Sequence, residues 1–160
     1  MSRNKIVEAE VTIRPFAEQH AAQVRELFIT VNRLLSPPEL RDAFEGYIDR
    51  ALAEEIDRIS AYYGERDGCF WVAVKGDKVV GTFGLERASD DAMELRRMYV
   101  DPSARRRGIA RRMLQFARKT NAAAETSHGF SLALLKYSRP RSRYTEMRDI
   151  DWFMKRLSRR

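Results

Sequence analysis

The sequence has few of the residues that build disulfide frameworks, metal centres or membrane spans. Its 160 residues include one cysteine and two histidines. A single cysteine cannot close an internal disulfide, and His20 and His128 lack metal-ligand spacing, so we expect both to be surface residues and expect no metal site. No apolar run approaches the roughly 20 residues that cross a bilayer, and Met1 to Lys5 do not lead into a signal-peptide core. These scarcities favour a cytoplasmic protein without a membrane span.

The overall composition is that of a folded globular domain. Hydrophobic residues make up 44% of the chain and charged residues 33%, which excludes an intrinsically disordered protein. A length of 160 residues suits one core, so we expect residues 1–160 to form a single domain. Cys69 lies in the apolar run Cys69-Phe70-Trp71-Val72, which predicts a buried structural thiol rather than a nucleophile.

Charge is unevenly distributed along the chain. Residues 1–102 hold 14 Lys and Arg against 19 Asp and Glu, a net charge of −5, whereas residues 103–160 hold 16 against 4, a net charge of +12. Together they give the formal net charge of +7. The C-terminal portion is therefore expected to attract a polyanion, either a small phosphorylated molecule or a nucleic acid.

The stretch from Met93 to Leu114 predicts a strand, a turn and a helix in succession. Glu94 to Val100 alternates and ends in Met98-Tyr99-Val100, which is typical of a strand. Asp101-Pro102-Ser103 is typical of a turn. The helix from Gly108 to about Lys119 has an apolar stripe made of Ile109, Met113, Phe116 and Ala117. Its unpaired first-turn amides, the positive end of its dipole and the small Gly108 and Ala110 predict an anion site.

These residues carry a family resemblance. The run Arg105-x-x-Gly108-x-Ala110, preceded by Glu-Leu-Arg-Arg-Met-Tyr-Val-Asp-Pro, resembles the acyl-CoA-binding motif of the GNAT acyltransferase superfamily. The resemblance implies an α/β fold with a mixed, mostly antiparallel central sheet flanked by helices. It is good over residues 10–120 and poor over residues 121–160.

The remainder of the N-terminal portion fits that fold. Val11 to Pro15 predicts a short strand, and Ala17 to Leu35 predicts a helix. A second helix is predicted to end before Gly64, with one apolar face formed by Leu40, Phe44, Tyr47, Ile48, Ala51, Leu52, Ile56 and Ile59. Phe70 to Lys75 and Val79 to Leu85 predict a hairpin around Gly76-Asp77. Glycines within the second hairpin strand indicate that another group, either a packed helix or a ligand, approaches the strand backbone closely.

The C-terminal portion is harder to interpret. The resemblance implies a fifth strand over residues 121–127, but the alanine-rich composition there favours continuation of the helix. Phe130 to Tyr137 resembles the fourth family helix, and residues 151–157 resemble a closing strand. The tail therefore departs from the family pattern.

The resemblance implies acetyl-CoA as cosubstrate and names the residues that hold it. The strand end Met98-Tyr99-Val100 would bond the pantetheine arm through its backbone, and the Met98 amide would stabilise charge on the thioester oxygen. The amides from Arg106 to Ala110, including Ile109, would hold the pyrophosphate. Arginine side chains would add charge-assisted contacts, namely Arg105, Arg106, Arg107 and Arg111.

Acetyl transfer to an amine also needs a general base, because an ammonium group cannot attack a thioester. The resemblance favours Glu94, with Glu86 as the second candidate; an ion pair with Arg96 or Arg97 is the structural alternative for Glu94. Strand alternation places Glu94 on one face with Arg96, Met98 and Val100.

A general acid is needed for the departing thiolate. The family commonly uses a tyrosine on the fourth helix, but Leu135 occupies the matching position here. Tyr137, two residues further on, and Tyr144 are the candidate acids, and water is the alternative.

The sequence therefore predicts a GNAT-type N-acetyltransferase that moves an acetyl group from acetyl-CoA to a primary amine of a small molecule. A non-catalytic acyl-CoA-binding module and a basic nucleic-acid-binding domain are the alternatives. Few aromatic residues accompany the arginines beyond Asn121, which disfavours nucleic acid. Whether the chain forms a homodimer stays open.

Overall fold

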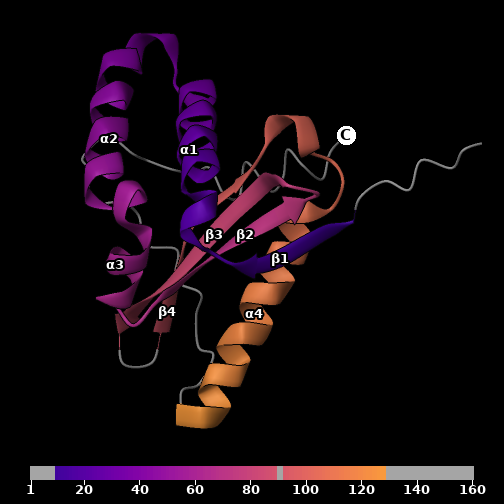
Figure 1. Cartoon of the computed structure of the whole chain (residues 1–160). Helices are drawn as coiled ribbons and strands as arrows, with labels where there is room; N and C mark the ends of the chain where they lie inside the picture. Colours follow the sequence, from indigo (N-terminus) through magenta and orange to yellow (C-terminus); the bar gives the residue numbers. More distant parts are fainter. Residues whose placement is uncertain (1–9, 90–91, 129–160) are drawn as a thin grey trace, which may run out of the picture.

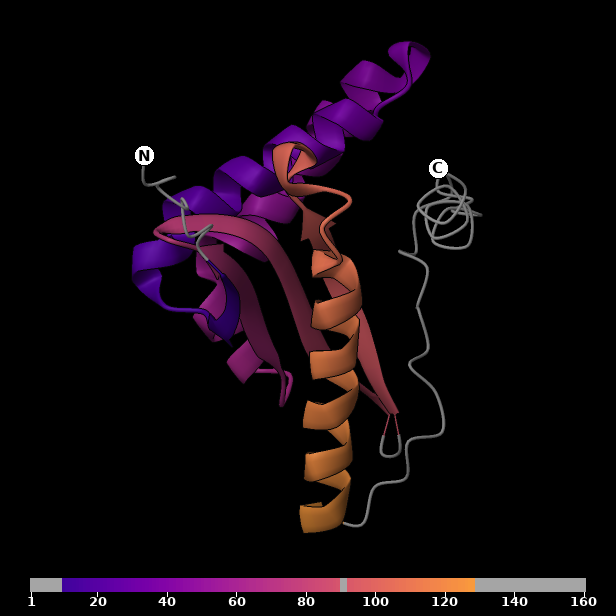
Figure 2. The same cartoon turned by 90° about the vertical axis from the view of Figure 1, so that its right-hand side faces the viewer.

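A four-stranded antiparallel sheet lies between two helical layers in the computed structural model, which describes residues 10–89 and 92–128 (Figure 1). The strand order is β1-β2-β3-β4, formed by Val11–Pro15, Cys69–Lys75, Lys78–Ser89 and Ala92–Val100. Helices α1 (Ala21–Leu35), α2 (Arg41–Glu54) and α3 (Ile59–Gly64) cover one face, and α4 (Ile109–His128) covers the other (Figure 2). The predicted α/β fold class is confirmed.

Helix α1 covers the sheet with the apolar stripe that its sequence predicts. Val24, Leu27, Phe28 and Val31 are at most 5% exposed, whereas Leu35 at the helix end is 44% exposed. The helix starts later than predicted, because Glu18–His20 forms a 3-10 turn (η1) before it. After Ser36-Pro37, a second 3-10 turn (η2, Pro38–Leu40) leads into α2, so α1 and α2 form an antiparallel hairpin (Figure 1).

The predicted second helix is not continuous. It is divided into α2, a 3-10 turn (η3, Ile56–Arg58) and α3. The break is at Glu55, whose φ of −134° and ψ of −59° are not helical. Apolar residues on both sides of the break, Ile48, Leu52, Ile56 and Ile59, are still buried, as their spacing predicts.

Two expectations about single side chains are wrong. His20 is 7% exposed rather than on the surface, because its Nδ1 accepts a hydrogen bond from the Ala17 amide at 3.0 Å and so turns the ring inward. Cys69 is exposed rather than buried. It is the first residue of β2, and burial begins at the next residue, Phe70.

The glycines of β3 serve packing on both faces of the sheet. A Cβ on Gly81 would lie 2.9 Å from the Met113 sulfur of α4, and a Cβ on Gly84 would lie 2.4 Å from the Tyr63 hydroxyl oxygen of α3. At either position a side chain would fit only if the helix residue beside it moved. Close helix packing, one of the two explanations that the sequence allowed, therefore accounts for both positions.

Helix α4 confirms its predicted stripe and extends further than the resemblance implied. Ile109, Met113 and Ala117 are at most 3% exposed, and Phe116 packs against the same core. The helix continues to His128, so the fifth strand expected over residues 121–127 is wrong, and the helical preference of the alanine-rich sequence prevails. The expectations for residues 130–137 and 151–157, including Tyr137, lie outside the described residues. Among those described, no helix has both the length and the apolar character needed to cross a membrane.

Candidate active site

Strand β4 is irregular at Arg97. Thr82 pairs with Tyr99, but Gly84 pairs with Arg96, so Phe83 of β3 faces two β4 residues, Arg97 and Met98. This two-against-one pairing is a β-bulge. Arg97 has a φ of +51°, in the left-handed region, and its carbonyl accepts a hydrogen bond from the Thr82 hydroxyl at 2.9 Å.

The bulge changes which side chains share a face. Tyr99 packs against the core beneath α1–α3, whereas Leu95 and Met98 pack against the core beneath α4. Strict alternation placed Met98 and Val100 on the same face as Glu94, and that expectation is wrong because both pack against the core beneath α4. The extra residue at the bulge reverses the alternation beyond Arg97.

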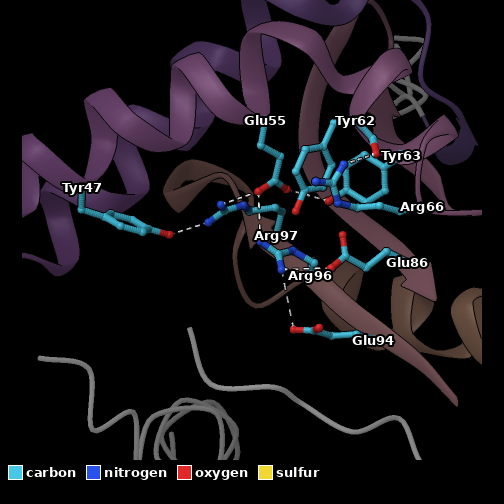
Figure 3. Close-up of polar contacts among 9 residues, drawn as sticks. All are labelled: Tyr47, Glu55, Tyr62, Tyr63, Arg66, Glu86, Glu94, Arg96 and Arg97. Atoms are coloured by element: carbon cyan, nitrogen blue, oxygen red, sulfur yellow. Dashed lines mark hydrogen bonds and ion pairs between the residues drawn. The ribbon is translucent and has the colours of Figure 1, made fainter. Parts of the chain in front are cut away.

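A cluster of five ionisable side chains, hereafter the charged cluster, fills the space between this strand and the helical layer (Figure 3). Its members are Glu55, Glu86, Glu94, Arg96 and Arg97. Three carboxylates and two guanidiniums give a formal charge of −1 when all are ionised. Such an arrangement can hold a cation or accept a proton.

The two candidate bases are neighbours in this cluster. Glu86 on β3 pairs directly with Glu94 on β4, and each residue is 8% exposed. Arg96 lies beside both carboxylates, with its Nη1 3.1 Å from Glu86 Oε1 and 3.9 Å from Glu94 Oε1. The alternative role foreseen for Glu94, an ion pair with Arg96, is therefore present. The second oxygen of Glu86 is buried without a hydrogen-bond partner among the described residues.

Glu55 joins the charged cluster from the break between α2 and α3. It is 2% exposed and accepts hydrogen bonds from the Tyr63 hydroxyl at 2.8 Å, from Arg96 Nη2 at 3.1 Å and from Arg97 Nη2. Burial alone would raise the pKa of its carboxyl, but the hydrogen bond and charge of Arg97, with the charge of Arg96, hold that pKa below its ordinary value. Glu55 is therefore an ionised carboxylate at neutral pH.

Three tyrosines surround the charged cluster, and none is poised as an acid near neutral pH. Burial raises the pKa of Tyr47, Tyr62 and Tyr63, and Glu55 raises that of Tyr63 further. The Tyr47 hydroxyl accepts a hydrogen bond from Arg97. Tyr47 and Tyr63 are hydrogen-bond partners of Arg97 and Glu55, respectively, whereas the Tyr62 ring lies beneath the guanidiniums of Arg66 and Arg96.

The predicted anion site lies at the other end of β4. Asp101 Oδ1 accepts hydrogen bonds from the Ser103 amide at 2.8 Å and hydroxyl at 2.6 Å, and so caps the 3-10 turn Pro102–Ala104 (η4). Lys78 Nζ lies 2.8 Å from Asp101 Oδ2. Burial would raise the pKa of Asp101, but Lys78 and Ser103 lower it below its ordinary value. The carboxylate therefore stays charged and fixes the turn that precedes α4.

The turn into α4 has the geometry of an anion-binding loop. Arg106 and Gly108 both have positive φ, +63° and +72°, and α4 begins at Ile109. A Cβ on Gly108 would meet no atom within 4 Å, so the space beside this backbone is open. Arg106 and Arg107 are exposed around the unpaired first-turn amides of α4. These features fit a pyrophosphate group.

The charged cluster and this turn are joined by one strand. Glu94 and Val100 are six residues apart, about 20 Å along an extended strand. The sequence identified both ends of this arrangement but missed Glu55, Tyr47 and Tyr63. The signal for Glu55 was a charged residue at a position where the helical stripe requires an apolar one.

Sequence comparison places the chain beside known acetyltransferases. The sequence model of the acetyltransferase (GNAT) domain matches residues 66–147, just over half of the chain. The N-acetylaspartate synthetase of Danio rerio is 42% identical over 90 residues, which cover 52% of this chain and 32% of that protein. N-acetyltransferase 8 of Homo sapiens is 39% identical over 82 residues, 45% of this chain and 36% of that protein. The match thus spans about a third of each relative.

Structural comparison gives the same fold. The PaiA N-acetyltransferase of Thermoplasma acidophilum, solved in complex with coenzyme A, has a TM-score of 0.59 and 18% identity over 72% of this chain and 74% of that one. A GNAT-family acetyltransferase of Brucella melitensis, in complex with acetyl-CoA, has a TM-score of 0.52 and 16% identity over 72% of this chain and 71% of that one.

Proposed function

This chain belongs to the GNAT acetyltransferase family, and on that premise we propose that it transfers the acetyl group of acetyl-CoA to a primary amine of a small molecule. One observation carries the proposal: β4 connects a pair of buried carboxylates to an anion-binding turn at the start of α4. Acetyl transfer would use both features. The phosphates of coenzyme A lie at one end of a long arm, where the turn would bind them, and the thioester lies at the other end, where a carboxylate would take the proton of the amine. The coenzyme A and acetyl-CoA complexes of the structural neighbours support the choice of cosubstrate.

The phosphate end of acetyl-CoA binds the turn before α4. The amides from Arg106 to Ala110, including that of Ile109, bond the pyrophosphate oxygens, and the open space beside Gly108 admits them. The side chains of Arg105, Arg106, Arg107 and Arg111 add charge-assisted contacts.

The pantetheine arm then follows β4 along backbone groups of Met98, Tyr99 and Val100. The order of strands leaves β4 at the edge of the described sheet, so its outer backbone groups are available to a ligand. The Met98 amide, at the bulge, donates a hydrogen bond to the thioester oxygen as negative charge develops there.

Glu94 is the general base, with Glu86 beside it as the second candidate. The amine nitrogen forms a bond to the acetyl carbonyl carbon, and the carbon–sulfur bond breaks with its electron pair on sulfur. The amine proton passes to the carboxylate, directly or through water. The thiolate takes a proton from Tyr137, from Tyr144 or from water.

The acceptor is tested with a panel of small amines. Relatives of this chain are named N-acetylaspartate synthetase, so aspartate and other amino acids come first in the panel, followed by diamines and aromatic amines. We expect acceptor-dependent release of the free coenzyme A thiol, matched by one acetylated amine per thiol.

Two outcomes would contradict the proposal. Tight binding of acetyl-CoA without thiol release for any amine would identify a non-catalytic binding module. Salt-dependent binding of DNA or RNA without measurable acetyl-CoA binding would identify a nucleic-acid-binding domain.

A further inference from the structure

The carboxylate of Glu55 holds two consecutive residues of β4 at once. Arg96 Nη2 lies 3.1 Å from Glu55 Oε2, and Arg97 Nη2 binds the same oxygen. Consecutive residues of a regular strand point to opposite faces of the sheet. Both arginines can reach one carboxylate only because β4 bulges at Arg97.

The bulge is unfavourable without these contacts. A non-glycine residue in the left-handed region costs about 1–2 kcal/mol, and Arg97 has a φ of +51°. Its side chain is only 11% exposed, so its guanidinium must also be compensated within the protein. Glu55 and the Tyr47 hydroxyl supply that compensation, and the guanidinium carbon lies 5.2 Å from the centre of the Phe28 ring.

Glu55 also interrupts its own helix to reach this position. The helical stripe places an apolar residue at position 55, yet the chain has a glutamate there with non-helical φ and ψ. The Tyr63 hydroxyl of α3 fixes the other carboxylate oxygen at 2.8 Å. The carboxylate is thus held by α3 through one oxygen and by β4 through the other.

We propose that Glu55 is a positioning residue for acetyl transfer, which acts by holding the β4 bulge in the conformation that presents the Met98 amide to the thioester. The inference rests on the proposed function, because it concerns the proposed oxyanion contact. Glu55 itself touches neither substrate. Its effect passes through Arg97, whose carbonyl accepts a hydrogen bond from the Thr82 hydroxyl.

The test compares Glu55→Gln with Thr82→Val. The first removes the charge that holds Arg97, and the second removes the hydrogen bond to the Arg97 carbonyl while every charge is left in place. The matched control is Glu54→Gln, which changes the exposed neighbouring residue. Single-turnover acetyl transfer, coenzyme A affinity and the backbone NMR shifts of Arg97 and Met98 are measured for each folded variant.

We expect Glu55→Gln to slow acetyl transfer by roughly 100-fold, as loss of one oxyanion donor does, while coenzyme A affinity changes little. Thr82→Val should slow transfer by about tenfold, since a single neutral hydrogen bond is lost. Both should shift the Arg97 and Met98 resonances, and Glu54→Gln should do neither.

Unchanged resonances in both variants, or unchanged transfer despite shifted resonances, would overturn the inference. So would a loss of transfer that merely tracks the fraction of unfolded protein. The NMR readout needs no turnover, so it separates this inference from the proposed function. A wild-type protein that transfers no acetyl group would refute the proposed function, whatever the shifts show.

Discussion

Glu86 and Glu94 lie directly opposite each other on β3 and β4, both buried, with the Arg96 guanidinium beside the two carboxylates. Like charges opposite each other on a sheet repel. The arginine reduces that repulsion while one oxygen of Glu86 stays without a partner among the described residues. We propose this pair as the place where an incoming ammonium group loses its proton.

The first prediction concerns this pair. Glu94→Gln should lower turnover by roughly 100-fold or more, the usual contribution of a general base. The loss should be greatest at acidic pH, where the amine acceptor is most protonated. The measurement is turnover against pH at saturating acetyl-CoA, with Glu45→Gln on α2 as control. If Glu86→Gln shows the larger loss instead, the roles of the two residues are exchanged.

The second prediction concerns the anion-binding turn. Gly108→Asp should weaken acetyl-CoA binding by at least about 100-fold, because it places bulk and negative charge where the pyrophosphate binds; such a loss would remove about 2.7 kcal/mol of binding free energy. Gly76→Asp is the matched control, since Gly76 also has a positive φ of +60° and open space beside it, but lies in the β2–β3 turn. Calorimetry measures both. Equal affinities for the two variants would refute the cofactor site.

The third prediction concerns the thiolate. If Leu135 occupies the position of the family acid, Tyr137→Phe and Tyr144→Phe should each cost much less than the roughly 100-fold that loss of a positioned acid brings. Turnover and acetyl-CoA affinity are measured together. A hundredfold loss of turnover for Tyr137→Phe with unchanged affinity would identify Tyr137 as the acid.

The fourth prediction concerns stability and pH. The pKa of Glu55 is lower in the folded protein than its ordinary value of 4.5, so the ionised carboxylate stabilises the fold above that ordinary value. This stabilisation is lost as pH falls through the lower folded value. Urea unfolding between pH 7 and pH 3 should therefore show a smaller pH dependence for Glu55→Gln than for the wild type. Glu54→Gln is the control, and equal slopes for all three proteins would contradict the assignment.

The fifth prediction concerns packing at β3. Gly84→Ala should destabilise the fold by about 1–3 kcal/mol, as overpacking of a core does, because its Cβ would overlap the Tyr63 ring. Gly46→Ala in α2 meets no neighbour and should instead stabilise by about 0.5–1 kcal/mol through the better helix propensity of alanine. Chemical denaturation measures both free energies of unfolding. A neutral Gly84→Ala would show that Tyr63 has room to move.

The sequence predicted the elements whose signals are local and periodic. The stripe of α1, the hairpin around Gly76-Asp77 and the strand–turn–helix around Asp101 all follow from neighbouring residues, and the structure confirms them. The helix break and the bulge could not be predicted this way. Each depends on a partner far along the chain, Glu55 on Arg97 and Arg97 on Glu55, and alternation or helical spacing takes no account of such pairs.

The predicted side-chain environments of His20 and Cys69 are wrong for a related reason. Burial depends on how elements end and on which elements cover them, and a short apolar run does not specify either. The resemblance failed at residues 121–127, where the composition of the chain itself favoured a helix.

The two glycines of β3 limit which amino-acid substitutions this strand can accept. Gly81 and Gly84 face Met113 and Tyr63 on opposite sides of the sheet, so both helical layers pack directly against the backbone of β3. Substitutions that fill either position would separate a layer from the sheet and displace β4 with it. In a library selected for new acceptors, we therefore expect β3 to tolerate almost no replacement. The exposed Leu34, Leu35 and Leu40 at the far end of the α1–α2 hairpin should accept many.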